Sequence, residues 1–227
     1  MRVRVATTLL GITAALLAVP ACSADTAATE PTTAPPARTA KPASGTTALS
    51  SAALKTRLLD ESDLGKGYLR KPERSAEHDD VAVIGCPALS ELGGEAAIGG
   101  SLAFPRRAKV SFTYGSSSEV SEELYSGHQD ALSDGIDEIF AAMTGCPTYQ
   151  VVAGSTPIDM ASQRLDPPRG LGDEQWSQLL TASAAGRSTV VKQTAIRAGN
   201  VLVIVSGSPA LVDRHLEKAL AKATATR

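Results

Sequence analysis

STVVKQTAIRAGNVLVIV, residues Ser188 to Val205, is the stretch that points most directly to an architecture. Ala198 to Asn200 is a turn sequence of the kind that joins antiparallel strands, so a β-hairpin is predicted with Ser188 to Arg197 as its first strand. Val201 to Val205 is an unbroken apolar run, which is typical of a central strand covered on both faces. We therefore expect this hairpin in the middle of a larger sheet.

Weaker alternation patterns predict the rest of the sheet. Val110, Phe112 and Tyr114 alternate with polar residues over 109–114, as in a strand with one buried face. Shorter patterns of this kind predict strands at Thr148 to Ala153, Met160 to Leu165 and Trp176 to Thr181.

Two helices are predicted N-terminal to the hairpin. The first runs from a cap at Ser50 or Ser51 to about Asp60. The second runs from Gly127 to Thr144, where apolar residues recur at the spacing of one buried stripe. Gly145 follows the second helix directly, and glycine is the commonest residue just after a helix end.

A turn-rich stretch, Glu61 to Gly67, is expected after the first helix, and a third helix is expected after the hairpin. Ser208 is the predicted N-cap of this last helix, and Pro209 is its first residue. The residues predicted to be buried are Leu54, Leu58 and Leu59 in the first helix, Leu132, Ile136, Ile139, Phe140 and Met143 in the second, and Val212, Leu216 and Leu220 in the third.

These elements predict an α+β fold, with a mainly antiparallel β-sheet flanked by helices, because they do not alternate in regular β-α-β units. Residues 49–227 are expected to form a single domain, and 43% hydrophobic residues in the chain are enough for its core. The formal net charge is −2 and aromatic residues make up 4% of the chain. A chain of this composition has neither a positively charged surface to attract phosphates nor many aromatic side chains to stack on bases. Nucleic acid is therefore not an expected partner.

The N-terminus has the features of an export signal. Two arginines precede Val5 to Val19, an uncharged apolar run too short for a comfortable transmembrane helix. Val19 to Cys22 is similar to a bacterial lipobox, although its proline is unusual at that position. We therefore predict a lipoprotein signal peptide at residues 1–21 and attachment of a diacylglycerol, with palmitate-type acyl chains, to Cys22. The alternative is ordinary secretion with cleavage after Ala21, which leaves a free thiol.

The cysteine count supports lipid attachment. The chain has three cysteines, and an odd thiol is unfavourable in an oxidising compartment unless something consumes it. A thioether at Cys22 leaves Cys86 and Cys146 as a pair, for which we expect a structural disulfide. The alternatives are two free thiols in the core, or a redox or metal-binding role for the cysteines. The sequence has no C-x-x-C spacing that would favour a redox or metal-binding role.

The expected location follows from the lipid anchor. Two or more acyl chains give stable anchoring, so the protein is predicted on the extracellular face of the cell membrane, with the membrane as a partner and no span through it. Residues 22–48 comprise the lipidated Cys22 and a stretch rich in Ala, Thr and Pro with no apolar periodicity. This stretch is predicted to be a disordered tether that holds the domain away from the bilayer.

No motif predicts catalysis or a bound cofactor. The sequence contains no G-x-S-x-G motif and no paired histidines at metal-ligand spacing. His128 and His215 lie in the polar parts of predicted helices, so both are expected to face solvent. Asp130, Asp134 and Asp137 form an acidic stripe opposite the apolar one, where a water-facing surface is expected. We therefore expect no enzyme, no metal site and no cofactor.

Several short motifs occur in a familiar order. They are the lipobox and tether, Leu58-Leu59 with Asp63-Leu64-Gly65 and Gly67-Tyr68, Cys86, Cys146 after a helix, Gly172-Asp173-Glu174, and Arg197-Ala198-Gly199-Asn200. Together they resemble the extracellular sensor domain of PknH-type receptor kinases, as found in lipoproteins of high-GC Gram-positive bacteria. The resemblance covers most of residues 49–227. It implies an antiparallel sheet flanked by helices, with a cleft for an unidentified ligand. That kinase domain has two disulfides, whereas this chain can form one.

Two functional hypotheses follow. In the first, the domain is a binding module that captures a small molecule or cell-wall fragment in a cleft between sheet and helices, with Tyr114, Trp176 or Arg164 among the polar groups. In the second, it is a non-enzymatic envelope accessory protein that acts on a protein partner through an exposed apolar patch. The family resemblance transfers no ligand-contacting residue to this chain.

Overall fold

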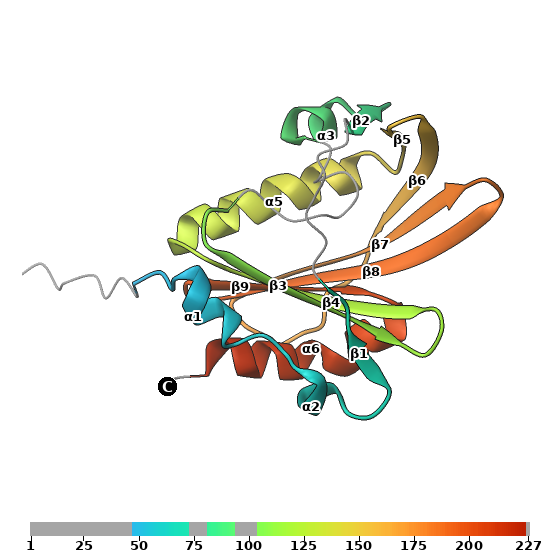
Figure 1. Ribbon diagram of the computed structural model, residues 1–227. Helices are drawn as coiled ribbons and strands as arrows, with labels where there is room; N and C mark the ends of the chain where they lie inside the picture. The colour runs from blue at the N-terminus through green and yellow to red at the C-terminus, as the bar shows by residue number, and fades with distance from the viewer. Residues whose placement is uncertain (1–46, 73–80, 94–103, 226–227) are drawn as a thin grey trace, which may run out of the picture. The chain divides into compact units, whose positions relative to one another are not determined.

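A continuous nine-stranded sheet forms the centre of the computed structural model, which describes residues 47–72, 81–93 and 104–225 (Figure 1). Its order is β1-β3-β4-β9-β8-β7-β6-β5-β2, and every neighbouring pair is antiparallel. The predicted α+β class is confirmed. The strands are β1 (Tyr68–Arg70), β2 (Val81–Ile84), β3 (Arg107–Tyr114), β4 (Ser118–Ser126), β5 (Thr148–Ala153), β6 (Thr156–Arg164), β7 (Glu174–Ala184), β8 (Arg187–Ala198) and β9 (Val201–Gly207).

The β8–β9 hairpin lies near the middle of this sheet, as its sequence predicts. Ala198 pairs with Val201, so Gly199 and Asn200 form a two-residue connection. Gly199 has a φ of 58°, a left-handed conformation that glycine adopts without steric cost. All residues from Val201 to Val205 are buried, because successive side chains enter the cores on opposite faces of the sheet.

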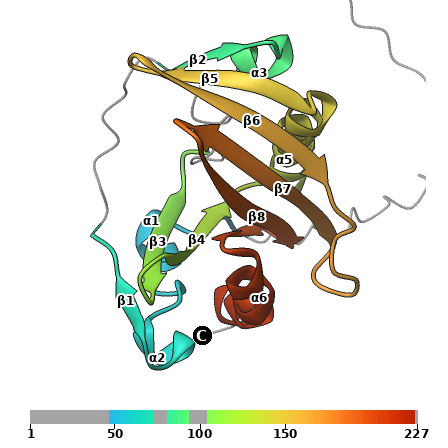
Figure 2. The ribbon, with the colours of Figure 1, turned by 90° about the vertical axis from the view of Figure 1, so that its right-hand side faces the viewer.

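Helices cover both faces of the sheet (Figures 1 and 2). On one face, α6 (Pro209–Thr224) packs with α1 (Ser51–Lys55) and α2 (Glu61–Leu64) over a core that includes Phe112, Val203 and Val212. On the other face lies α5 (Gln129–Gly145), above a core that includes Tyr125, Ile136 and Leu202. A third core surrounds Leu89 of α3 (Pro87–Leu92), next to the C-terminal half of α5.

The predicted N-terminal helix is shorter in the structure. It ends at Lys55, and the segment predicted to be a turn contains a second helix, α2. The cause is local: the Asp60 carboxylate accepts the backbone N–H groups of Ser62 at 2.9 Å and Asp63 at 3.1 Å and so caps a new helix.

The two long helices agree with the sequence except at their ends. α6 begins at Pro209 after Ser208, as expected, whereas α5 begins at Gln129 rather than Gly127. Gly145 is the last residue of α5 instead of the residue after it, and Cys146 is the C-cap. Ile139 is only partly buried, and it packs between the two cores that flank α5.

Strand β4 is not predicted by the local sequence pattern, although it lies inside the sheet between β3 and β9. Its sequence, SEVSEELYS, contains three glutamates, and charged residues are unusual in an inner strand. Glu122 and Glu123 are nevertheless 1% and 3% exposed. The short edge strands β1 and β2 are also absent from the sequence prediction.

Residues 1–46 are outside the described part of the chain. They include the predicted signal peptide, Cys22 and almost all of the predicted tether, so these assignments remain predictions. Within the described ranges, the structure has no helix with the length and apolar character needed to cross a bilayer.

Candidate functional site

A cavity of about 180 Å³ lies between α5 and the strands β6 and β7. The helix forms one wall, and the sheet, with the chain that follows β6, forms the other. Its lining residues are Asp137, Phe140, Ala141, Thr144, Arg164, Leu165, Pro167, Gln175, Trp176 and Ser177. This is the kind of cleft between sheet and helix that the first functional hypothesis expects.

Two aromatic rings form the apolar part of the cavity. Trp176, the single tryptophan of the chain, is 9% exposed, and its ring centroid lies 6.4 Å from that of Phe140. The indole Nε1 of Trp176 donates a hydrogen bond to Asp137 Oδ1 at 2.5 Å. This bond joins β7 to α5 and fixes the orientation of the indole, because the donor is satisfied only in that position.

Arg164 is the cationic group of the cavity. It is the last residue of β6 and is exposed, and its side chain has no hydrogen-bond or ion-pair partner in the described part of the chain. The next residue, Leu165, donates its backbone N–H to the carbonyl oxygen of Ser177 at 2.9 Å. That bond holds the chain against β7 at the point where Arg164 leaves the sheet.

The structure brings together two of the three polar residues named from the sequence. Trp176 and Arg164 both line the cavity. Tyr114 does not, because it lies at the end of β3, where its ring stacks on Tyr68 with centroids 4.6 Å apart. Asp137 is exposed as predicted, but its bond to the indole makes it part of the site, which no pattern in the sequence indicates.

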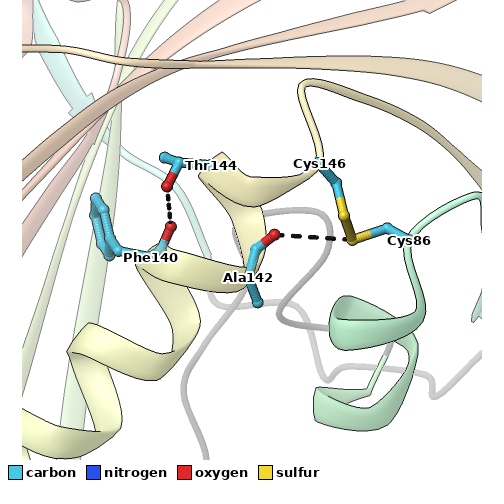
Figure 3. Close-up of a disulfide and its surroundings, with 5 residues drawn as sticks. All are labelled: Cys86, Phe140, Ala142, Thr144 and Cys146. Atoms are coloured by element: carbon cyan, nitrogen blue, oxygen red, sulfur yellow. Dashed lines mark hydrogen bonds between the residues drawn. A yellow bond between two sulfur atoms is a disulfide. The ribbon is translucent and has the colours of Figure 1, made fainter.

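Cys86 and Cys146 form a disulfide, with Cα atoms 5.8 Å apart (Figure 3). Cys86 is the N-cap residue of α3, and Cys146 is the C-cap residue of α5. The Cys86 sulfur also lies 3.7 Å from the carbonyl oxygen of Ala142, a packing contact because a disulfide sulfur carries no hydrogen. The bond agrees with the pairing expected from the sequence.

The disulfide is close to the cavity along α5. Thr144, which lines the cavity, is two residues before Cys146, and its hydroxyl donates to the carbonyl oxygen of Phe140 at 2.6 Å (Figure 3). The last two turns of α5 therefore carry Phe140 of the aromatic wall and end at the disulfide. The bond thus anchors the end of the helix that forms one side of the site.

Two motifs that carry the family resemblance pack against each other where β7 begins and β8 ends. Arg197 donates to Glu174 at 2.7 Å and to Asp173 at 3.1 Å, and the Gly199 N–H donates to Asp173 at 2.7 Å. The bond from Arg197 is the main cause that lowers the pKa of Glu174. A Cβ on Gly172 would lie 2.5 Å from the carbonyl oxygen of Arg197, so only glycine fits there. These motifs therefore maintain the fold and do not line the cavity.

His215 is buried, in contrast to the sequence prediction that it faces solvent. It is 4% exposed, and its Nε2 lies 2.6 Å from the hydroxyl of Tyr68, with which it shares a hydrogen bond. Burial is the main cause that lowers the pKa of His215. The prediction is wrong because β1, 147 residues earlier in the chain, covers this side of α6. His128 is exposed, as expected.

Glu122 is a buried carboxyl group away from the cavity. Its Oε2 accepts the backbone N–H of Leu59 at 2.6 Å, whereas its Oε1 is buried with no hydrogen-bond partner among the described residues. Burial raises the pKa of Glu122 to about 8. In the neighbouring Glu123, by contrast, both carboxylate oxygens have partners. Lys109 lies 2.6 Å from one oxygen, and the Tyr125 hydroxyl donates a hydrogen bond to the other.

A second, larger depression of about 420 Å³ lies on β5, β6 and β7. Its lining mixes short polar side chains with larger ones such as Tyr149 and Met160, and Gln150 donates to Asp159 at 2.9 Å. It lacks the wall from a helix that the first cavity has, so the cavity under α5 is the better candidate. Over residues 47–72, 81–93 and 104–225, no cluster of three His, Cys, Asp or Glu side chains is arranged to hold a metal ion.

The fold is that of a known extracellular domain. The sequence matches no protein family and no curated protein. The structure is similar to the crystal structure of the extracellular domain of PknH from Mycobacterium tuberculosis, with a TM-score of 0.58 and 13% identity over 78% of this chain and 97% of that one. It has a weaker similarity, with a TM-score of 0.46 and 13% identity over 76% of this chain and 97% of the other, to an uncharacterized Mycobacterium smegmatis protein, the Rv0999 ortholog.

Proposed function

We propose that this chain is an extracellular, lipid-anchored protein whose domain binds a small ligand in the cavity under α5, in a sensor-like role without catalysis. One observation carries the proposal: an aromatic wall and one cationic side chain, which has no partner among the described residues, line the same cavity between a helix and the sheet. Such sites, mostly apolar with few polar groups, are typical of small-molecule binding. The PknH-like fold supports the extracellular setting.

The alternative, an accessory protein that acts through an apolar surface patch, has less support. The large apolar side chains that are exposed in the described residues are Leu69, Ile84, Tyr114 and Val190, which lie on four different strands. Single apolar residues of this kind are normal on a protein surface.

Ligand binding can be measured directly because Trp176 is the only tryptophan and lines the cavity. We expect one member of a panel of N-acetylglucosamine, N-acetylmuramate, D-alanyl-D-alanine and short-chain fatty acids to change the fluorescence of Trp176. At about 100 times its Kd, the same compound should stabilise the fold by about 2.7 kcal/mol. The measurements are fluorescence titration and thermal unfolding of the full-length chain carrying Cys22→Ser.

A pair of matched variants tests whether the ligand binds in the cavity under α5. Ala141→Leu places a larger side chain in the cavity wall and should abolish binding, whereas Ala131→Leu makes the same change on an exposed position of α5 outside the cavity. No response to any compound, or equal binding by both variants, would count against the proposed site.

The lipid anchor is tested in cells. Cys22→Ser should move the protein from the membrane fraction to the medium, because the acyl chains supply the anchoring. Thr29→Ser, in the predicted tether, should leave the protein on the membrane. Fractionation followed by immunoblotting checks both variants. Retention of Cys22→Ser on the membrane, or wild-type protein found free in the medium, contradicts the anchor.

A further inference from the structure

We infer that the ligand of the cavity under α5 is a small carboxylate that bears a single negative charge and an apolar body, with Arg164 binding the carboxylate. This inference rests on the proposed function and names the chemical class of its ligand.

The size of the cavity limits the ligand. Its volume of about 180 Å³ is below the range of roughly 300–1,000 Å³ typical of sites for drug-sized molecules. A ring with a short substituent fits this volume, whereas a polymer fragment or a long acyl chain would extend outside it.

The hydrogen-bonding groups of the cavity favour an anion. The side chains of Thr144, Gln175 and Ser177 each already bond to another atom of the protein, and Asp137 accepts the indole N–H. Arg164 is left as the polar side chain of the lining with no partner among the described residues. A guanidinium group binds a carboxylate through two parallel hydrogen bonds, so a carboxylate complements the group that remains.

The lining of the cavity combines apolar rings with charged groups of both signs, which restricts the charge and the chemical character of the ligand. Phe140 and Trp176 offer ring surfaces to an apolar body. Asp137, on the α5 wall, carries a negative charge that repels a second anionic group. A monoanion with its charged end on Arg164 and its apolar end against the rings meets both conditions, whereas a dianion does not.

The test is a titration of Trp176 fluorescence with phenylacetate, with its uncharged analogue phenylacetamide and with phenyl phosphate, which is mostly dianionic above about pH 7. On the full-length chain with Cys22→Ser, we expect phenylacetate to bind at least about tenfold more tightly than either analogue. Arg164→Gln should remove this preference. Arg169→Gln, an equal change of charge at an exposed position outside the cavity lining, should retain it.

The outcomes separate this inference from the proposed function. If phenylacetamide binds as tightly as phenylacetate and Ala141→Leu abolishes both, the cavity binds ligands but the inferred carboxylate class is wrong. If phenyl phosphate binds most tightly, the site prefers a dianion and the inference is also wrong. If neither these probes nor the earlier panel change the fluorescence or the unfolding temperature, both proposals fail.

Discussion

Glu122→Gln should stabilise the folded chain near pH 8 and change its stability little near pH 5. The pKa of Glu122 is about 8 in the folded chain, and 4.5 is its ordinary value. As the pH rises between these values, the unfolded state loses the proton while the folded state keeps it, so stability falls. One pKa unit corresponds to about 1.4 kcal/mol, so by pH 8 wild-type Glu122 costs several kcal/mol. Gln does not titrate and can still accept the Leu59 N–H.

The measurement is urea unfolding of both chains at several pH values, since the difference between them isolates this one group. Glu123→Gln is the matched control, because its carboxylate is equally buried but is paired with Lys109 and Tyr125. That variant should be less stable than the wild type, because Lys109 and Tyr125 lose the carboxylate that they contact. An equal effect of Glu122→Gln at pH 5 and pH 8 would show that Glu122 is not protonated in the folded chain.

Removing the disulfide through Cys86→Ala and Cys146→Ala should cost about 4 kcal/mol of stability. The bond joins residues that are 60 positions apart in the sequence. The value of about 4 kcal/mol is the free energy that corresponds to the conformational entropy that a crosslink of this span removes from the unfolded chain. The loss should be largest around β2 and α3, because β2 is an edge strand that pairs with β5 alone. Denaturant unfolding gives the total, and hydrogen exchange of residues 81–92 gives the local effect.

Reduced wild-type protein is the control for this double variant, because it keeps both sulfur atoms and loses only the bond between them. Its stability should lie close to that of the double variant. If the oxidised and reduced chains unfold at the same denaturant concentration, the disulfide does not stabilise the fold. Mass spectrometry of the unreduced protein tests the bond itself, because a disulfide lowers the mass by two hydrogen atoms. A mass without this loss would contradict the disulfide.

Local patterns were sufficient for the elements with strong periodicity. The β8–β9 hairpin, α5 and α6 were predicted because their turn residues, caps and apolar stripes act within a few residues of one another. Strand β4 could not be predicted in this way. Its buried Glu122 is satisfied in part by Leu59, 63 residues earlier in the chain, so its environment is not visible in the strand itself.

The candidate site was predicted only in part. Trp176 and Arg164 stand out by residue type, but Asp137 resembles an ordinary solvent-facing residue of α5, and Tyr114 does not line the cavity. A single aspartate has no distinguishing local pattern. Its role appears only when α5 lies against β7, where the indole of Trp176 meets it.

The amino-acid sequence was enough to establish the α+β class, the main helices, the central hairpin and the expected cysteine pairing, since each depends on neighbouring residues or on a simple count. The export signal and the lipid on Cys22 remain predictions from the same source. The packing of distant segments decided the rest: which helix covers which strands, how a strand rich in glutamate is accommodated, and where a cavity remains. The physical reason is that burial, desolvation and the partners of polar groups are set by residues tens to hundreds of positions apart, which no local pattern encodes.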